Sequence, residues 1–242
     1  MTWVKICGMT NLEDALTAVD AGADAVGFVF YEKSPRNISV GAAREIVEKL
    51  PEGVEKIGVF VGNASGNPME IFLDAGLSGM QIYDPPDGSF FQMGAVGLHD
   101  RLLHARFLRP LAMSLTAKNE EEIKELASNF AGLRKHWRNG ARPNEPEMAT
   151  VLLDSGDLQM PGGTGRKFDW EKAVPVAEGM QQGGVNLVVA GGLTPENVGQ
   201  AIDILKPWGV DVVSGVEASP GKKDPEKVRA FVRAVRDAER SL

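Results

Sequence analysis

Two side chains of this sequence could transfer protons, and each closes a short apolar run. Cys7 ends the run "WVKIC" and Asp154 ends the run "ATVLLD". A thiolate can remove a proton from carbon while a carboxylic acid protonates a leaving oxygen, and this pair of steps suits an isomerisation. Position alone leaves a second interpretation of each residue, with Cys7 as a small buried hydrophobic side chain and Asp154 as the anchor of a loop.

Glycine-containing segments follow the last two apolar runs of the chain. Gly191 and Gly192 stand in "VVAGGL", and Ser214 and Gly215 stand in "VVSGVE". Glycine lets the backbone approach a ligand closely, and the N–H groups at the start of a helix attract anions. A tight turn would explain a single pair, but two such segments after consecutive runs favour a phosphate site.

Two further segments could contribute to the same site. Arg36 lies in "KSPRNIS"; a surface arginine is the ordinary interpretation, but its guanidinium could also pair with a carboxylate through two hydrogen bonds. Gly163 lies in the stretch "PGGTGRKFDW" at 161–170, which we expect to form a lid or another phosphate-binding loop. That stretch lacks the Lys-Ser/Thr ending of a P-loop, which argues against a nucleoside triphosphate.

The sequence offers no pattern typical of a metal site. His, Cys, Asp and Glu residues do not cluster with the spacing of metal ligands. The three histidines, His99, His104 and His136, lie in or beside predicted helices rather than at the ends of apolar runs. We therefore expect no metal and no organic cofactor, so that the reaction depends on the chain's own side chains.

These candidate residues require a fold that brings the ends of many apolar runs together. Eight apolar runs alternate with eight segments that we interpret as helices. Runs rich in Val, Ile and Ala with little polar alternation suit a parallel sheet that is buried on both faces. We predict strands at 3–7, 23–30, 55–61, 77–83, 105–114, 149–154, 185–191 and 209–215, and helices at 11–22, 39–50, 67–76, 88–104, 119–137, 169–180, 194–205 and 225–240.

Eight strand–helix units in 242 residues predict an α/β fold, a (β/α)8 TIM barrel with a closed, parallel eight-stranded sheet. An open doubly wound sheet is the alternative, but it usually has fewer strands, and no G-x-G-x-x-G motif follows the first strand. In a barrel, functional residues gather where the strands end. We expect a single barrel domain over residues 1–242, with the polar segment 138–148 as a loop insertion.

Composition argues against several classes of partner. The net charge is -7 and no long basic run occurs, which argues against nucleic acid. No apolar run approaches the ~20 residues of a membrane-spanning helix, and the N-terminus has no signal-peptide pattern. The single cysteine cannot form an internal disulfide. We expect a cytoplasmic protein whose partner is a small molecule.

Several segments closely resemble the phosphoribosylanthranilate isomerase family of tryptophan biosynthesis, in order along nearly the whole chain. They are "KICGMT" (5–10), "GFVFYEKSPRNIS" (27–39), "LLDS" (152–155), "GGTGRKFDW" (162–170), "VVAGGLTPENV" (188–198) and "GVDVVSGVEASPGKKD" (209–224). The first strand with its Lys-Ile-Cys-Gly and the stretch at 162–170 are the specific parts, because many barrels share the two phosphate loops.

The resemblance implies an Amadori rearrangement of N-(5-phosphoribosyl)anthranilate to 1-(2-carboxyphenylamino)-1-deoxyribulose 5-phosphate. It implies that Asp154 is the general acid that opens the ribose ring and that Cys7 is the general base that removes the C2 proton. Arg36 would hold the anthranilate carboxylate. The glycine loops would bind the 5-phosphate, which gives as further substrate-binding residues Gly163, Gly191, Gly192, Ser214 and Gly215. The active unit would be a monomer or a homodimer.

The resemblance is weakest at the end of the fourth predicted strand. The family usually has Gln-Leu-His-Gly there, whereas this chain has "QIYD", so that Tyr83 and Asp84 replace His and Gly. This difference bears on the shape of the fourth and fifth loops and on substrate range. Two alternatives stay open: a phosphosugar-binding barrel without catalysis, and an isomerase of a related phosphorylated aminoaldose. The residue patterns of indole-glycerol-phosphate synthase and ribulose-phosphate epimerase are absent.

Overall fold

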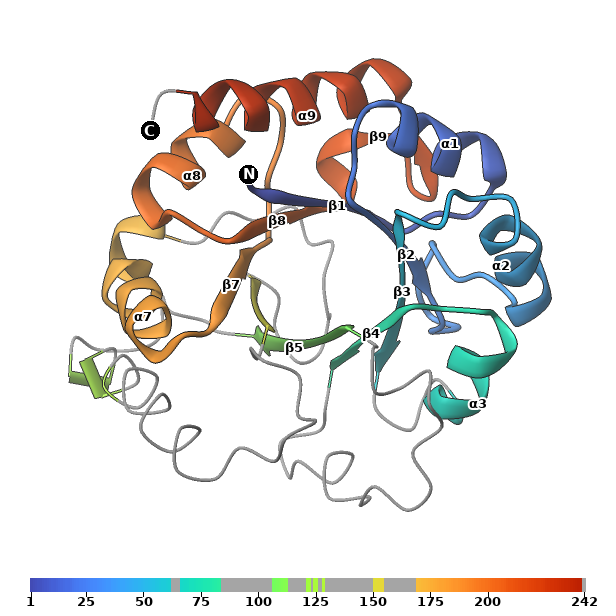
Figure 1. The fold of residues 1–242 in the computed structure, drawn as a ribbon, viewed down its shortest axis with the longest axis horizontal. Helices are drawn as coiled ribbons and strands as arrows, with labels where there is room; N and C mark the ends of the chain where they lie inside the picture. The colour runs from blue at the N-terminus through green and yellow to red at the C-terminus, as the bar shows by residue number, and fades with distance from the viewer. Residues whose placement is uncertain are drawn as a thin grey trace.

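The computed structural model describes residues 1–61, 66–83, 106–112, 150–154 and 169–240, together with five isolated positions between 121 and 128. Parallel strands pair in sequence order from β1 to β8, and β8 pairs back with β1 (Figure 1). The strands are β1 (Trp3–Cys7), β2 (Ala25–Val29), β3 (Glu55–Val61), β4 (Gly79–Tyr83), β5 (Arg106–Ala112), β6 (Thr150–Asp154), β7 (Asn186–Val189) and β8 (Gly209–Val212).

Helices cover the outside of these strands in the described part of the chain (Figure 1). They are α1 (Leu12–Asp20), α2 (Val40–Val47), α3 (Pro68–Asp74), α7 (Trp170–Gly183), α8 (Val198–Leu205) and α9 (Pro225–Glu239). Polar residues start several of them, because a side-chain oxygen accepts a hydrogen bond from a free backbone N–H in the first turn. Asn11 caps α1, Ser39 caps α2 and Asp224 caps α9 in this way.

The expected (β/α)8 barrel with one closed, parallel eight-stranded sheet needs correction in the regularity of its strand–helix repeats and of its strand pairing. Within the described residues a covering helix follows six strands, β1–β3 and β6–β8. The predicted helices at 88–104 and 119–137 and the predicted insertion at 138–148 lie outside those residues, apart from the isolated positions. The ladder is also uneven, because only two residue pairs are in register between β7 and β8. The described residues therefore contain six complete strand–helix repeats rather than eight.

The segment after β8 is a second departure from a regular, all-parallel barrel. It forms a 3₁₀ helix, η3 (Ser214–Val216), and then an antiparallel two-stranded sheet of β9 (Glu217–Ser219) and β10 (Lys222–Lys223) before α9 begins. This hairpin buries two charged side chains, Glu217 and Lys223, which pair with each other at 3.1 Å. Buried charges need such pairing, and the hairpin provides it by placing the two side chains beside each other.

The helix after β7 begins later than its sequence predicts. Thr194 and Pro195 read as the cap and first residue of a helix, but α8 begins at Val198. The Thr194 backbone N–H donates to Asn197 Oδ1 at 2.9 Å, and Asn197 Nδ2 donates to the Gly192 carbonyl at 2.9 Å. These two bonds tie the loop into a turn, so the turn replaces the first helical residues.

Apolar side chains fill two regions, one between the strands and helices and one inside the ring of strands. The inner region extends from the end where the strands begin to the floor of the cavity, and it contains Trp3, Ala25, Ile57, Leu152, Val188 and Ala190. Trp208 closes it, because its ring stacks on that of Trp3 at 5.3 Å between centroids. The other end of the ring combines polar side chains with a smaller cluster of Cys7, Val59 and Tyr83.

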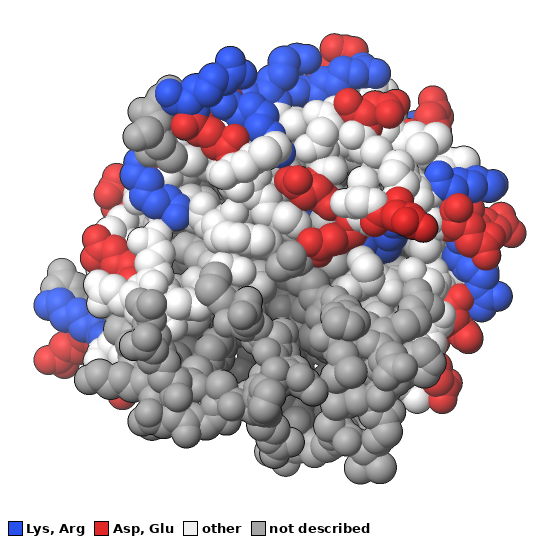
Figure 2. Space-filling view, viewed as in Figure 1, with Lys and Arg blue, Asp and Glu red and all other residues white. Residues whose placement is uncertain are grey.

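Exposed charges gather over α9, as Figure 2 shows at the top of the view. Arg229 pairs with Glu226 at 2.7 Å and Arg240 pairs with Asp237 at 3.0 Å, one turn apart on the helix surface. Such exposed pairs contribute little to stability. Among the described residues, no helix is both long enough and apolar enough to cross a membrane.

Candidate active site

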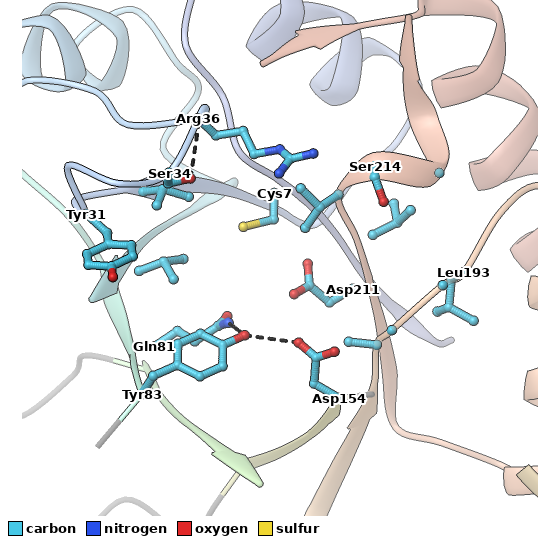
Figure 3. A pocket seen from close by; sticks show the side chains of 18 of the residues that line it. Cys7, Tyr31, Ser34, Arg36, Gln81, Tyr83, Asp154, Leu193, Asp211 and Ser214 are labelled. Atoms are coloured by element: carbon cyan, nitrogen blue, oxygen red, sulfur yellow. Dashed lines mark hydrogen bonds between the residues drawn. The ribbon is translucent and has the colours of Figure 1, made fainter. Parts of the chain in front are cut away.

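A cavity opens where the strands end, with a volume of about 700 Å³ counting the space open to solvent. Figure 3 shows side chains from opposite sides of the ring pointing into it. The site residues predicted from the sequence that line it are Cys7, Arg36, Asp154, Gly191, Gly192, Ser214 and Gly215. Gly163 lies outside the described residues, as does Asp84. The cavity therefore brings together every predicted site residue that the structure describes.

Cys7 is the last residue of β1 and is buried, with 3% of its surface exposed. Gly27 lies beside it in β2, and a Cβ at Gly27 would come within 2.5 Å of the Cys7 sulfur, so glycine leaves room for the thiol. Burial raises the pKa of the Cys7 thiol above its ordinary value, although the positive charges of Lys5 and Lys223 oppose this. The thiol is therefore the resting form near neutral pH, and the two lysines favour the thiolate.

Asp154 is the last residue of β6 and is also buried, across the cavity from Cys7 (Figure 3). Tyr83, the last residue of β4, donates its phenolic hydroxyl to Asp154 Oδ2 at 3.1 Å. Burial, with the negative charge of Asp154, raises the pKa of Tyr83 well above its ordinary value. Tyr83 is therefore a neutral hydrogen-bond donor to the carboxyl group at all ordinary pH values.

Beneath these groups, three polar side chains meet inside the ring of strands. Lys5 Nζ donates to Gln81 Oε1 at 2.7 Å and to Asp211 Oδ2 at 3.0 Å. Gln81 Nε2 in turn donates to the Tyr83 hydroxyl at 3.2 Å. Burial would lower the pKa of Lys5, but Asp211 and Cys7 outweigh it and the pKa is raised. Lys5 is therefore a fixed buried cation directly below the proposed base.

Asp211 uses only one of its two carboxylate oxygens in a hydrogen bond among the described residues. Its Oδ2 accepts from Lys5, whereas its Oδ1 is buried with no hydrogen-bond partner among the described residues. Asp211 is 4% exposed and lines the cavity. A buried acceptor without a partner is costly, and a hydroxyl group of a bound ligand could satisfy it.

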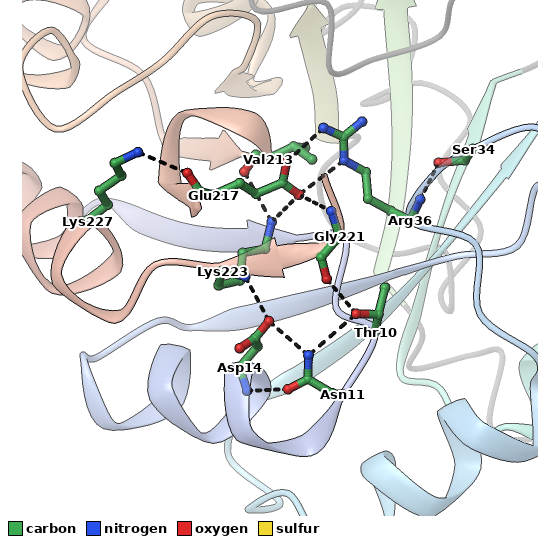
Figure 4. A network of polar contacts seen from close by, with 10 residues as sticks. All are labelled: Thr10, Asn11, Asp14, Ser34, Arg36, Val213, Glu217, Gly221, Lys223 and Lys227. Atoms are coloured by element: carbon green, nitrogen blue, oxygen red, sulfur yellow. Dashed lines mark hydrogen bonds and ion pairs between the residues drawn. The ribbon is translucent and has the colours of Figure 1, made fainter. Parts of the chain in front are cut away.

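Arg36 is held from behind by Glu217 of the hairpin (Figure 4). Its Nε donates to Glu217 Oε1 at 3.1 Å and its Nη2 donates to Oε2 at 2.7 Å. Burial would raise the pKa of Glu217, but Arg36 and Lys223 outweigh it and the pKa is lowered. Arg36 is thus no loose surface side chain, because the two parallel bonds fix the plane of its guanidinium at the cavity wall.

Lys223 supports the same arrangement from the interior. Its Nζ donates to Glu217 Oε1 at 3.1 Å and to the Val213 carbonyl at 3.1 Å, and its backbone N–H donates to Asp14 Oδ2 at 2.8 Å (Figure 4). Burial lowers the pKa of Lys223, although Glu217 opposes this. The hairpin is therefore tied both to α1, through Asp14, and to the wall of the cavity.

The two glycine loops need glycine for different reasons. Gly191 and Gly192 have φ of 79° and 66°, a conformation that strains residues with a side chain. Gly215 sits so close to the loop after β7 that a Cβ there would lie 1.9 Å from the Leu193 carbonyl oxygen. The loops after β7 and β8 therefore pack directly against each other, and their glycines present backbone to the cavity.

A model of the N-(5'phosphoribosyl)anthranilate (PRA) isomerase family matches residues 4–84 and 138–234. The N-(5'-phosphoribosyl)anthranilate isomerase of Rubrobacter xylanophilus is 40% identical over 242 residues, which cover 98% of this chain and 100% of the relative. That of Pseudomonas aeruginosa is 43% identical over 237 residues, which cover 98% and 96%. The chain belongs to the N-(5'-phosphoribosyl)anthranilate isomerase family.

Solved structures of the same family are similar over the whole chain. The phosphoribosyl anthranilate isomerase of Thermotoga maritima is 34% identical with a TM-score of 0.73, covering 98% of this chain and 100% of that one. One solved with reduced 1-(o-carboxyphenylamino)-1-deoxyribulose 5-phosphate is 33% identical with a TM-score of 0.70 and the same coverage. The predicted family resemblance and the predicted enzyme, an isomerase of tryptophan biosynthesis, are confirmed.

Several polar residues of this N-(5'-phosphoribosyl)anthranilate isomerase family site were not predicted as site residues. They are Gln81, Asp211, Glu217 and Lys223. A signal existed for two of them, because Gln81 and Asp211 are polar residues inside otherwise apolar strands. Both lie an even number of residues from a cavity-lining neighbour, so strand alternation turns them inward. Glu217 and Lys223 belong to a hairpin whose two strands are too short to show an alternation of apolar and polar residues in the sequence.

Proposed function

We propose that this cavity catalyses the rearrangement of N-(5-phosphoribosyl)anthranilate to 1-(2-carboxyphenylamino)-1-deoxyribulose 5-phosphate. The observation that carries the proposal is the meeting of Cys7 and Asp154 at one cavity, flanked by Arg36 and by the two glycine loops. This set supplies a base, an acid, a carboxylate-binding group and a phosphate-binding backbone. Each of these four groups acts on a different part of the substrate, so the arrangement fits the substrate as a whole.

The acid and base act in sequence on neighbouring atoms. Asp154 gives a proton to the ribose ring oxygen as its bond to C1 breaks, and the nitrogen lone pair forms the C1–N double bond. Cys7 as thiolate then takes the proton from C2, and the electrons of that C–H bond become the C1–C2 double bond of an enolamine. Proton gain at C1 and proton loss from the C2 hydroxyl give the ketone, so the net change is an isomerisation.

Binding groups hold the two charged ends of the substrate. Arg36 receives the anthranilate carboxylate, because Glu217 already orients its guanidinium plane. Gly191, Gly192, Ser214 and Gly215 receive the 5-phosphate on backbone N–H groups. The unpartnered Asp211 Oδ1 accepts from a sugar hydroxyl. The solved relative that holds the reduced product-like compound supports a ligand of this class.

We further propose that this reaction takes place in the cytoplasm, by a chain that acts as a monomer or a homodimer. The single cysteine supports a reducing compartment, because proteins of oxidising compartments commonly use their cysteines in disulfides and one cysteine cannot form an internal disulfide. A solved structure of the Thermotoga maritima isomerase concerns monomers generated from a dimeric enzyme, so that relative is a dimer.

Turnover tests the proposal directly. Freshly made N-(5-phosphoribosyl)anthranilate is followed by the loss of its fluorescence, with the native chain, Cys7→Ala and Asp154→Ala. Removal of a general acid or base is expected to lower kcat by about a hundredfold to ten-thousandfold. Asp203→Ala, which removes an exposed carboxylate of α8, is the matched control and should keep the native rate. A native chain that binds ribose 5-phosphate without turnover, or active Cys7 and Asp154 variants, would overturn the proposal.

A further inference from the structure

The hydrogen bonds beneath the cavity have a direction that can be worked out proton by proton. An ammonium group only donates, so the atom of Gln81 that faces Lys5 must be its amide oxygen. The amide nitrogen of Gln81 therefore faces Tyr83, and it too can only donate. The single phenolic proton of Tyr83 is then left for the other hydrogen-bond partner of its hydroxyl, the Asp154 carboxyl group.

Each step of this chain is buried, which keeps water from reversing it. Lys5 is 0% exposed, Gln81 is 2% exposed and Tyr83 is 9% exposed. Asp211 anchors the far end by holding Lys5 Nζ at 3.0 Å. The orientation of the phenol is thus set by a fixed positive charge two side chains away, rather than by whatever occupies the cavity.

Resting on the function proposed above, we propose that Tyr83 is a positioning residue for the acid Asp154, and that Gln81 and Lys5 fix the direction in which Tyr83 donates. Because Asp154 Oδ2 accepts the phenolic proton, the proton that Asp154 gives to the substrate is carried by Oδ1. The bond also strengthens as Asp154 loses its proton, since a hydrogen bond to an ionised acceptor is the stronger one. Tyr83 therefore assists the step in which the sugar ring opens.

Tyr83→Phe tests this inference, because it removes only the hydroxyl. We expect kcat to fall about tenfold to a hundredfold, the effect of losing one hydrogen bond to a charged group, with KM within about threefold. Tyr31→Phe is the matched control. Tyr31 is the only other tyrosine in the sequence and lines the same cavity, so it reports what the loss of a phenolic hydroxyl does to KM without Asp154.

The proton affinity of Asp154 is the readout that a merely structural role would not move. A hydrogen bond to the carboxylate favours its ionised form, so its loss in Tyr83→Phe should raise the pKa of Asp154. The measurement is a ¹³C NMR titration of protein labelled at aspartate carboxyl carbons, with the Asp154 signal assigned by Asp154→Asn. Tyr31→Phe should leave that titration where it is.

A double-mutant cycle separates action through Asp154 from a general effect. If Tyr83 acts through the acid, adding Tyr83→Phe to Asp154→Asn should lower kcat by less than twofold further. Full additivity, or an unmoved Asp154 titration in Tyr83→Phe, would overturn the inference. The NMR titration needs no substrate, so it decides the role of Tyr83 even for a native chain that fails to turn over the proposed substrate.

Discussion

The interior of the ring of strands differs completely between the end where the strands begin and the end where they finish. One strand, β1, supplies a side chain at three levels: Trp3 at the first end, Lys5 in the middle and Cys7 at the other end. The backbone alternation that turns all three inward is the same. Only the residue type changes, so packing and chemistry occupy separate levels of a single strand.

The middle level shows why the two ends stay separate. Lys5, Gln81 and Asp211 form a buried polar layer between the apolar residues and the cavity. A buried ion pair is weak evidence for stability, since replacing it with apolar side chains is often neutral or stabilising. Its use here is to place fixed charge beneath Cys7 and to orient the hydrogen bonds that reach Asp154.

Lys5→Met is expected to have the largest effect, because it should lower both the stability of the fold and the rate of the reaction. It leaves the Asp211 carboxylate buried without its cation, which costs about 3–5 kcal/mol of unfolding free energy. It also removes a positive charge that favours the Cys7 thiolate, so kcat should fall too. Urea denaturation and turnover assays measure the two effects.

The double variant Lys5→Met with Asp211→Asn is the control for the stability part. It removes the uncompensated charge, so it should recover much of the lost unfolding free energy while kcat stays low. A Lys5→Met chain as stable as the native one would contradict the assignment of a structural ion pair.

Ile57→Ala tests the apolar end alone. Ile57 is 0% exposed, packs inside the ring in the same cluster as Trp3 and is not among the residues that line the cavity. Truncation of a buried isoleucine is expected to cost about 2–5 kcal/mol of unfolding free energy. The kcat of the folded fraction should stay within about twofold, measured well below the unfolding temperature. A large fall in kcat without a loss of stability would show that the two ends are coupled.

The sequence predicts the cavity end well where a residue's position along the chain carries the information. Cys7 and Asp154 were identifiable because each ends an apolar run, and the glycine loops because two of them follow consecutive runs. Parallel strands then bring those ends together whatever the details of packing. Strand positions were accordingly close, with β1 at 3–7 and β3 at 55–61 as predicted.

Pairing between distant residues is what the sequence did not reveal. Lys5 meets Gln81 across 76 positions and Asp211 across 206 positions, and only the barrel register brings them together. The Arg36–Glu217 pair spans 181 positions and depends on a hairpin with no sequence period. The prediction that a helix begins after Thr194 was wrong, because the hydrogen bond between the Thr194 N–H and the Asn197 side chain favours a turn there. The role predicted for Gly163 stays a prediction.

Arg36→Lys has the smallest expected effect and sharpens the chemical end of the comparison. A lysine keeps the charge but has no planar fork, so it cannot both bind Glu217 through two nitrogens and present a third nitrogen to a substrate carboxylate. We expect KM for N-(5-phosphoribosyl)anthranilate to rise about tenfold, a change of about 1.4 kcal/mol, while kcat changes far less. Ribose 5-phosphate separates the two binding groups, because it carries the phosphate but no carboxylate. Its inhibition constant should therefore change less than the KM of the substrate, whereas equal weakening of both ligands would show that Arg36 acts on the phosphate or on the fold and not on the anthranilate carboxylate.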